Sequence, residues 1–279
     1  MRKKGISLST LLSVVTLTGC GVLVPEIRDF PNAGSAAQNN LLVQAIVISI
    51  RCELQDAVTN VINADVDTAK ANRFYYAQFL KNWGAQVALT LRMEEKSSIS
   101  PNGAYLPVSP LTSVFSLSGG LSATADATRV DKINFYYKVT ELYLGRDRKC
   151  IRDTNPPRDS LLIQSDLKLG EWLDAMINGS ATGIITAVSN KNVLSHQITF
   201  QVTTAGNLTP AWRLVRGTVN QSGSFLTASR DRQHDLVVTF GPLDTTQSGS
   251  FLLPIAENSH TSSQLISGVT TGFKSALGQ

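Results

Sequence analysis

The sequence is poor in the residues that build catalytic and metal sites. Only three histidines and three cysteines occur among 279 residues. No HExxH pair, no Gly-x-Ser-x-Gly turn and no glycine-rich loop with a following lysine is present, so the common signatures of zinc proteases, serine hydrolases and phosphate-binding loops are missing. Neither Cys52 nor Cys150 has a second ligand at metal spacing. We therefore expect no metal and no cofactor.

Charge and long apolar runs are also scarce. Charged residues make up 16% of the chain and hydrophobic residues 42%, a composition typical of a folded protein. After the first twenty residues no segment reaches the roughly eighteen uninterrupted apolar residues that a membrane-spanning helix needs. The densest basic stretch, 146–158, is interrupted by Asp147, Asp153 and two prolines. This pattern indicates a solvated loop, and we expect no nucleic-acid partner.

The N-terminus has the pattern of a secretory leader. Three basic residues at positions 2–4 precede a short apolar stretch, 11–17, which is too short to span a bilayer. The segment Leu17-Thr18-Gly19-Cys20 that follows resembles the lipobox of bacterial lipoproteins. In that family the cysteine is acylated and becomes the mature N-terminus.

The resemblance implies a lipoprotein signal peptide over 1–19 and a palmitate-type acyl anchor on Cys20. In the Gram-negative lipoproteins of this kind, Gly21 in place of an aspartate implies the outer membrane. We therefore expect a lipid-anchored protein on the periplasmic face of the cell outer membrane. Loss of the leader also leaves about 22 basic against 21 acidic residues, so the mature chain is nearly neutral.

If Cys20 carries lipid, Cys52 and Cys150 are the two cysteines that remain. An oxidising compartment favours a disulfide between them. Such a bond closes a loop of about 98 residues, for which chain entropy suggests ~4.7 kcal/mol of stabilisation. Free buried thiols, or a bridge between two chains, are the alternatives.

Composition and periodicity predict the organisation of the chain. Residues 20–40 are rich in proline, glycine and polar residues, which favours a flexible tether. Apolar spacing predicts helices over 41–62, over 69–83, from Asp166 onward and over 261–277. Alternation predicts strands around 87–93, 115–121, 133–139, 198–202, 212–214 and 236–240. We predict an α+β domain over 41–245, with antiparallel β meanders packed against helices, and then a linker and an amphipathic helix over 246–279. A β-sandwich with helical decorations is the alternative.

Two similar halves, 41–150 and 151–245, are suggested by the order of features. A strand leads to Pro101 and later to Arg129, and a second strand leads to Pro210 and later to Arg230. Coincidence among common turn residues is the alternative. The equivalence makes Arg129 and Arg230 candidate binding residues for an acidic partner or an anionic glycan. Their alternative role is to bind loop carbonyls or a carboxylate within the fold.

Two clusters of titratable residues raise the hypothesis of a hydrolase. Asp231, His234 and Asp235 imitate an acid–base site, although residues 234 and 235 point to opposite faces if they lie on a strand. Glu171 and Asp174 share a helical face beside an aromatic residue, as in some carbohydrate-active sites. A solvated strand end and an amphipathic helix explain the same residues more simply, so we assign no catalytic residue.

The mature domain resembles uncharacterised proteobacterial lipoproteins that combine a Cys-Glu-Leu helix, here Cys52-Glu53-Leu54, with strands of this kind. That resemblance implies no activity. We expect a non-enzymatic scaffold or partner-binding module for another envelope protein, with an apolar patch that includes the helix Leu265–Leu277. A protein that binds a glycan, lipid or peptidoglycan fragment in a cleft between the halves is the alternative. A cell-envelope hydrolase ranks last.

Overall fold

The computed structural model describes residues 23–27, 36–108, 115–152, 160–181, 192–214, 217–220, 223–244 and 252–276. The expected signal peptide over 1–19 and Cys20 lie outside the described residues. The chain divides into two compact units. Unit 1 contains Met1–Ile27, Arg92–Val130 and Gln201–Gln233, and unit 2 contains Arg28–Leu91, Asp131–Phe200 and His234–Gln279.

The described strands form two four-stranded sheets. The order β4-β1-β8-β5 joins the long strands, which are β1 (Trp83–Ile99), β4 (Ala123–Lys138), β5 (Leu194–Leu208) and β8 (Leu226–Pro242). The order β3-β2-β7-β6 joins short strands of unit 1, which are β2 (Asn102–Tyr105), β3 (Leu117–Gly120), β6 (Trp212–Leu214) and β7 (Gly217–Val219). Each half of the chain thus supplies a long, two short and another long strand. The duplication itself stays a prediction.

Neighbouring strands run antiparallel. Across β1 and β8, Glu95 pairs with Arg230 and the Ser98 hydroxyl contacts that of Thr227, so residue number rises on one strand as it falls on the other. In the small sheet, β2 pairs antiparallel with both β3 and β7. The predicted antiparallel sheets are therefore confirmed, while the order β4-β1-β8-β5 places strands that are not consecutive in sequence side by side.

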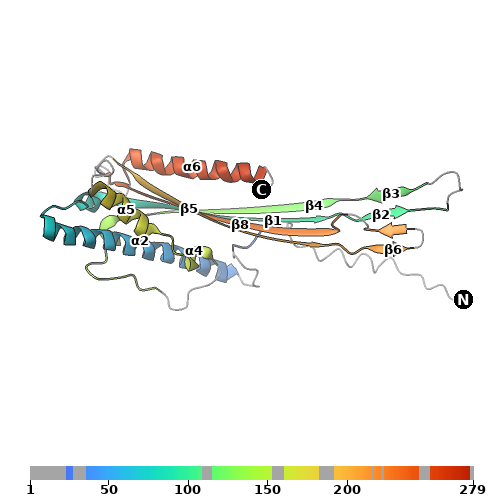
Figure 1. Ribbon diagram of the computed structural model, residues 1–279, viewed down its shortest axis with the longest axis horizontal. Helices are drawn as coiled ribbons and strands as arrows, with labels where there is room; N and C mark the ends of the chain where they lie inside the picture. The colour runs from blue at the N-terminus through green and yellow to red at the C-terminus, as the bar shows by residue number, and fades with distance from the viewer. Residues whose placement is uncertain are drawn as a thin grey trace. The chain divides into compact units, whose positions relative to one another are not determined.

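Helices cover both faces of the sheet in unit 2 (Figure 1). They are α2 (Ala36–Asn72), α3 (Val139–Leu142), α4 (Leu161–Gln164), α5 (Leu169–Ala181) and α6 (Pro254–Ala276), with the short 3-10 turn η2 (Gln78–Asn82) before β1. His260 of α6 contacts Thr239 of β8, whereas Trp172 of α5 packs against Phe240 of the same strand. Adjacent strand residues point to opposite faces. This is the predicted α+β class rather than the sandwich of two sheets.

The core of unit 2 is built from α2, α5 and the sheet. Helix α2 packs against α5, and the Arg51 guanidinium of α2 lies 5.5 Å from the ring centre of Tyr137 on β4. The buried residues of α2 recur every three or four positions, as one helical face requires. They are Leu42, Ile46, Ile50, Leu54, Val58 and Val61, and the strands contribute Trp83, Val87, Leu89, Leu91, Leu236, Val238 and Phe240. Full burial of each large side chain contributes about 1.5–3 kcal/mol.

A disulfide joins Cys52 of α2 to Cys150, whose Cα atoms lie 5.2 Å apart. The same helix binds the segment around Cys150 through polar contacts. The Asp56 carboxylate accepts a hydrogen bond from the Cys150 N–H at 2.8 Å, and the Thr59 hydroxyl accepts one from the Leu144 N–H at 3.0 Å. The disulfide therefore adds a covalent tie to a segment that α2 already holds.

The predicted helix over 69–83 is wrong. Helix α2 continues beyond the predicted end at 62 as far as Asn72, where Arg73 adopts a φ of 54° and its N–H bonds to the Ala69 carbonyl at 2.7 Å. This is a left-handed helix end. The aromatic residues of this segment are therefore divided: Phe74 and Tyr75 precede η2, Phe79 lies within it, and fully buried Trp83 opens β1. Apolar residues four apart fit either a helix face or such a strand entry.

Two other boundaries also differ from the prediction. The helix expected from Asp166 begins three residues later, since Lys168 has a φ of 58° and donates its N–H to the Asp166 carboxylate at 2.9 Å. Helix α6 begins at Pro254 and not at 261. A proline suits a first helical turn, where its missing N–H has no partner to lose. Residues 246–251 of the expected linker lie outside the described residues.

Candidate functional site

The two candidate arginines hold the chain's own N-terminal segment in unit 1. Arg129 of β4 donates to the Pro25 carbonyl at 3.5 Å, and Arg230 of β8 donates to the Glu26 carbonyl at 2.7 Å. Pro25 is buried and Ile27 is only 2% exposed. These residues therefore differ from the loose tether expected over 20–40, and α2 already begins inside that range.

Arg230 also forms an ion pair. Its Nε lies 2.9 Å from Glu95 Oε1, and the two side chains are 17% and 16% exposed. Solvent screens such a pair less than it screens a fully exposed one. The structure thus brings Arg129 and Arg230 to adjacent carbonyls of one segment. This geometry matches the structural role described above, in which arginines bind loop carbonyls and a carboxylate.

The cluster of Asp231, His234 and Asp235 does not converge on a site. Asp231 accepts a hydrogen bond from the Gln201 side chain at 2.9 Å, and Asp235 accepts one from the Thr199 hydroxyl at 2.6 Å. Each carboxylate therefore binds a side chain of β5. His234 alternates to the face opposite Asp235 and is buried. An acid–base dyad needs both groups on one side of a substrate, so these residues do not form one.

The acids of α5 are likewise occupied on the helix surface. Glu171 forms an ion pair with Lys168 at 2.7 Å, and Asp174 accepts a hydrogen bond from the side chain of Asn178, one turn later. The Trp172 ring turns toward the sheet, where it stacks on His196 with ring centres 4.9 Å apart. The aromatic residue therefore docks the helix and does not face the two carboxylates as a ligand platform.

Helix α6 is amphipathic, but its apolar side faces away from the sheet. The side that faces the sheet carries small and polar residues, including Ala256, His260 and Ser267, none more than 9% exposed. The opposite side carries an apolar row, the α6 apolar stripe, whose side chains are 54–66% exposed. It consists of Ile255, Leu265, Ile266, Val269 and Phe273. The 3.6-residue period places these five on one side of the helix, with Leu265, Ile266, Val269 and Phe273 within about 12 Å of its length and Ile255 about 15 Å before them. Exposed apolar patches of this kind mark interaction sites. Leu277 lies outside the described residues.

A polar network attaches α6 to the sheet. His260 is 1% exposed, and its Nε2 accepts a hydrogen bond from the Gln264 amide at 2.9 Å. Its Nδ1 lies 2.8 Å from the Thr239 hydroxyl, which in turn lies 3.3 Å from the Ser195 hydroxyl of β5. Burial lowers the pKa of His260 to about 4. The ring is therefore neutral at pH 7, and its Nδ1–H donates to Thr239.

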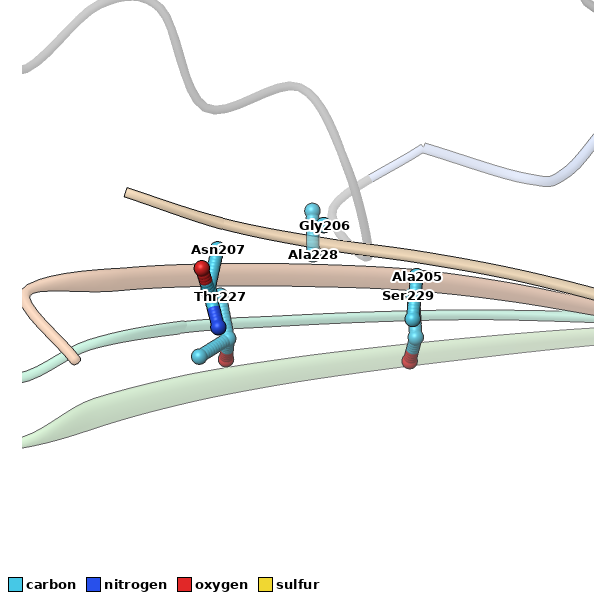
Figure 2. Close-up of a pocket in the computed structure, with 6 residues that line it drawn as sticks. All are labelled: Ala205, Gly206, Asn207, Thr227, Ala228 and Ser229. Carbon is cyan, nitrogen blue, oxygen red and sulfur yellow. The ribbon is translucent and has the colours of Figure 1, made fainter. Parts of the chain in front are cut away.

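Two neighbouring strands of unit 1 border a hollow of about 370 Å³, and Figure 2 shows the residues that line it. Asn207 of β5 lies beside Thr227 of β8, and Ala205 lies beside Ser229, with Gly206 and Ala228 between them. The six lining residues carry no charge and no titratable group. Small side chains on two neighbouring strands account for the hollow, and its chemistry points to no ligand class.

The described ranges show no three His, Cys, Asp or Glu side chains grouped as a metal site requires. Likewise, none of the described helices is long and apolar enough to cross a membrane.

Comparison with known proteins assigns no family. No protein-family model matches the chain, and no curated protein matches it. Among solved structures, the secretin InvG of the Salmonella SPI-1 type III secretion injectisome is 12% identical, with 66% of this chain and 70% of that chain covered and a TM-score of 0.15. The open-gate InvG structure is 11% identical, with 73% and 70% covered and a TM-score of 0.15. Likeness at this level supports no inference about fold or function.

Proposed function

We propose that this chain is a lipid-anchored envelope protein that acts as a non-enzymatic partner-binding module on the periplasmic face of the outer membrane. The α6 apolar stripe is the observation that carries the proposal. Five large apolar side chains face outward on a helix whose inner side is polar and buried. In a surface helix the apolar side normally faces the core. The reversed arrangement leaves apolar surface for another molecule to cover.

A protein surface suits the stripe better than a lipid surface. Helices that lie in the membrane interface carry lysine and arginine on their polar side. Over Pro254–Ala276 the charged residues are Glu257 and Lys274 alone, so attraction to anionic lipid is weak. Leu, Ile, Val and Phe side chains in a row instead match a helix or groove with an apolar face of its own.

The arginine contacts support a short connection to the expected anchor. Acylation of Cys20 would leave four residues, and five Cα–Cα steps, between the acylated cysteine and Pro25, which Arg129 holds. Five fully extended steps span at most about 18 Å. The anchor would therefore hold unit 1 close to the membrane, rather than leave it on a twenty-residue tether.

The proposal is tested by crosslinking in intact cells. A photoreactive residue replaces Val269 within the stripe, and the products are compared in the wild-type background, in Leu265→Ser/Phe273→Ser and in Leu208→Ser. Leu208 is a matched control, because it is 59% exposed and belongs to β5 of unit 1.

We expect a discrete crosslinked partner that disappears in the double variant and persists in the control. Identical products in all three backgrounds would contradict the proposal. A product that is lipid, glycan or peptidoglycan and not protein would favour the alternative of a ligand-binding protein.

A further inference from the structure

The long sheet ends in two edge strands. In the order β4-β1-β8-β5, each of β4 and β5 has a strand neighbour on one side only among the described residues. β4 has 16 residues and β5 has 15. Long edges present rows of backbone N–H and C=O groups that can pair with another strand.

In the long sheet, a pair of strands with the same order is repeated side by side. The first half supplies β4 and β1 as neighbours, and the second half supplies β8 and β5 in the same order. The seam between the halves pairs β1, the first long strand of its half, with β8, the last long strand of its own half. The small sheet has the same arrangement, since β3-β2 is followed by β7-β6 with its seam at β2 and β7.

If this order is continued past β5, the next strand is the last long strand of a first half. That strand is β4 of a second copy of the chain. We propose that the protein self-associates head to tail, with β5 of one copy pairing antiparallel with β4 of the next in the way that β1 pairs with β8 inside each copy. Such a heterologous contact uses two different edges, so it adds copies in one direction.

The side chains of the two edges are complementary. At the seam within unit 2, Leu89 and Leu91 of β1 and Leu236 and Val238 of β8 are completely buried. The corresponding positions on the edges hold apolar residues that are only half-buried. On β5 they are Ile198 and Phe200, and on β4 they are Ile133, Phe135 and Tyr137. Association would bury them as the seam buries its own leucines.

One register aligns these rows. Antiparallel pairing that sets Ile198 opposite Tyr137 also sets Phe200 opposite Phe135, and aromatic and β-branched pairs of this kind stabilise adjacent strands. The same register sets Gln197 of β5 opposite Lys138 of β4 on the other face. Gln197 is exposed and Lys138 is half-buried at the end of its strand, so both positions accept a cysteine with little effect on the core.

Mixed disulfide crosslinking tests the proposal on the full chain in a Cys20→Ala background. Gln197→Cys protein is mixed with Lys138→Cys protein under mild oxidation. As a control, Gln197→Cys is mixed with Asn134→Cys, which lies on the same face of β4 about 13 Å further along. Near-ultraviolet circular dichroism verifies that each variant is folded, and light scattering measures molar mass against concentration.

We expect a mixed dimer from Gln197→Cys with Lys138→Cys, at least tenfold above each variant alone and above the Asn134 control, together with a mass that rises with concentration. Crosslinks within Gln197→Cys alone would show a two-fold contact and overturn the head-to-tail geometry. Crosslinking at 134 in place of 138 would overturn the register. A constant monomer mass without any mixed crosslink would overturn self-association. Because the edges do not include α6, Leu265→Ser/Phe273→Ser should leave the crosslink unchanged whether or not the proposed function holds.

Discussion

Lowering the pH from 7 to 5 should weaken the attachment of α6 to the sheet through His260. This side chain is buried against Thr239 and Gln264, and burial lowers its pKa from 6.5 to about 4. Below about pH 6.5, His260 is protonated in the unfolded chain but stays neutral in the folded chain. Stability is therefore lost as the pH falls from about 6.5 to about 4. Protonation would also place an N–H of the ring against the amide of Gln264, which donates to it.

The magnitude follows from the two pKa values. A tenfold difference in proton affinity corresponds to about 1.4 kcal/mol. With 6.5 in the unfolded and about 4 in the folded chain, the loss between pH 7 and pH 5 is about 2 kcal/mol. His196, whose pKa burial also lowers, acts in the same direction. Burial raises the pKa of Glu53, so that group loses stability as the pH rises and acts oppositely.

The assay is urea denaturation at pH 7, 6 and 5 for the wild type and His260→Gln, together with hydrogen exchange of the α6 amides. His260→Gln lowers stability at pH 7, but it should remove about 2 kcal/mol of the loss between pH 7 and pH 5. Exchange of α6 should accelerate at pH 5 in the wild type relative to the strands. If the wild type and the variant lose the same stability over this range, the reasoning about His260 is refuted.

Three further outcomes follow from single contacts. Cys52→Ser/Cys150→Ser should lose up to about 4.7 kcal/mol of unfolding free energy, because the bond closes a separation of 98 residues; equal denaturation midpoints with and without the bond would contradict this. Gly241→Ala would place a Cβ 2.5 Å from that of Ala256, so denaturation should show a loss of about 1–3 kcal/mol, partly restored by Ala256→Gly. Arg230→Met should speed limited proteolysis within residues 23–27, and unchanged cleavage would exclude its role in holding that segment.

The class of fold was predictable because apolar and polar residues alternate along the strand segments of both halves, with the two-residue period typical of β-strands. The β1 segment illustrates this, since Val87, Leu89 and Leu91 are fully buried and Thr90 between them is not. Strand lengths were underestimated because β1 continues to Ile99 through charged residues. Arg92, Glu94 and Lys96 pair with one another there, and local periodicity does not reveal such pairing.

Helix ends were less predictable, because they depend on single backbone conformations. Arg73 and Lys168 both adopt a positive φ, which is uncommon for residues other than glycine. Neither position stands out in the sequence. Predictions placed there failed by three residues at the start of α5 and over 73–83 of the segment 69–83, since 69–72 belong to α2.

The candidate sites were foreseen in part. Leu265, Val269 and Phe273 follow from four-residue spacing, but a predicted start at 261 left out Ile255 and His260, and Ile266 does not fit a strict four-residue step. The contacts of Arg129 and Arg230 with residues 25 and 26 join positions about a hundred or more apart in sequence. Only the tertiary fold identifies such partners, although the two arginines were identified as related residues.

The most direct test of the proposed function is the accessibility of the α6 apolar stripe in the cell envelope. With Cys52 and Cys150 bonded and Cys20 acylated, a Phe273→Cys variant carries one free thiol, and Leu208→Cys is its control in unit 1. The rate of labelling by a hydrophilic thiol reagent is measured in intact envelopes and in the purified protein. If a partner covers the stripe, position 273 should react at least tenfold more slowly in envelopes while position 208 reacts at the same rate in both. Equal rates for position 273 in the two preparations would contradict the account.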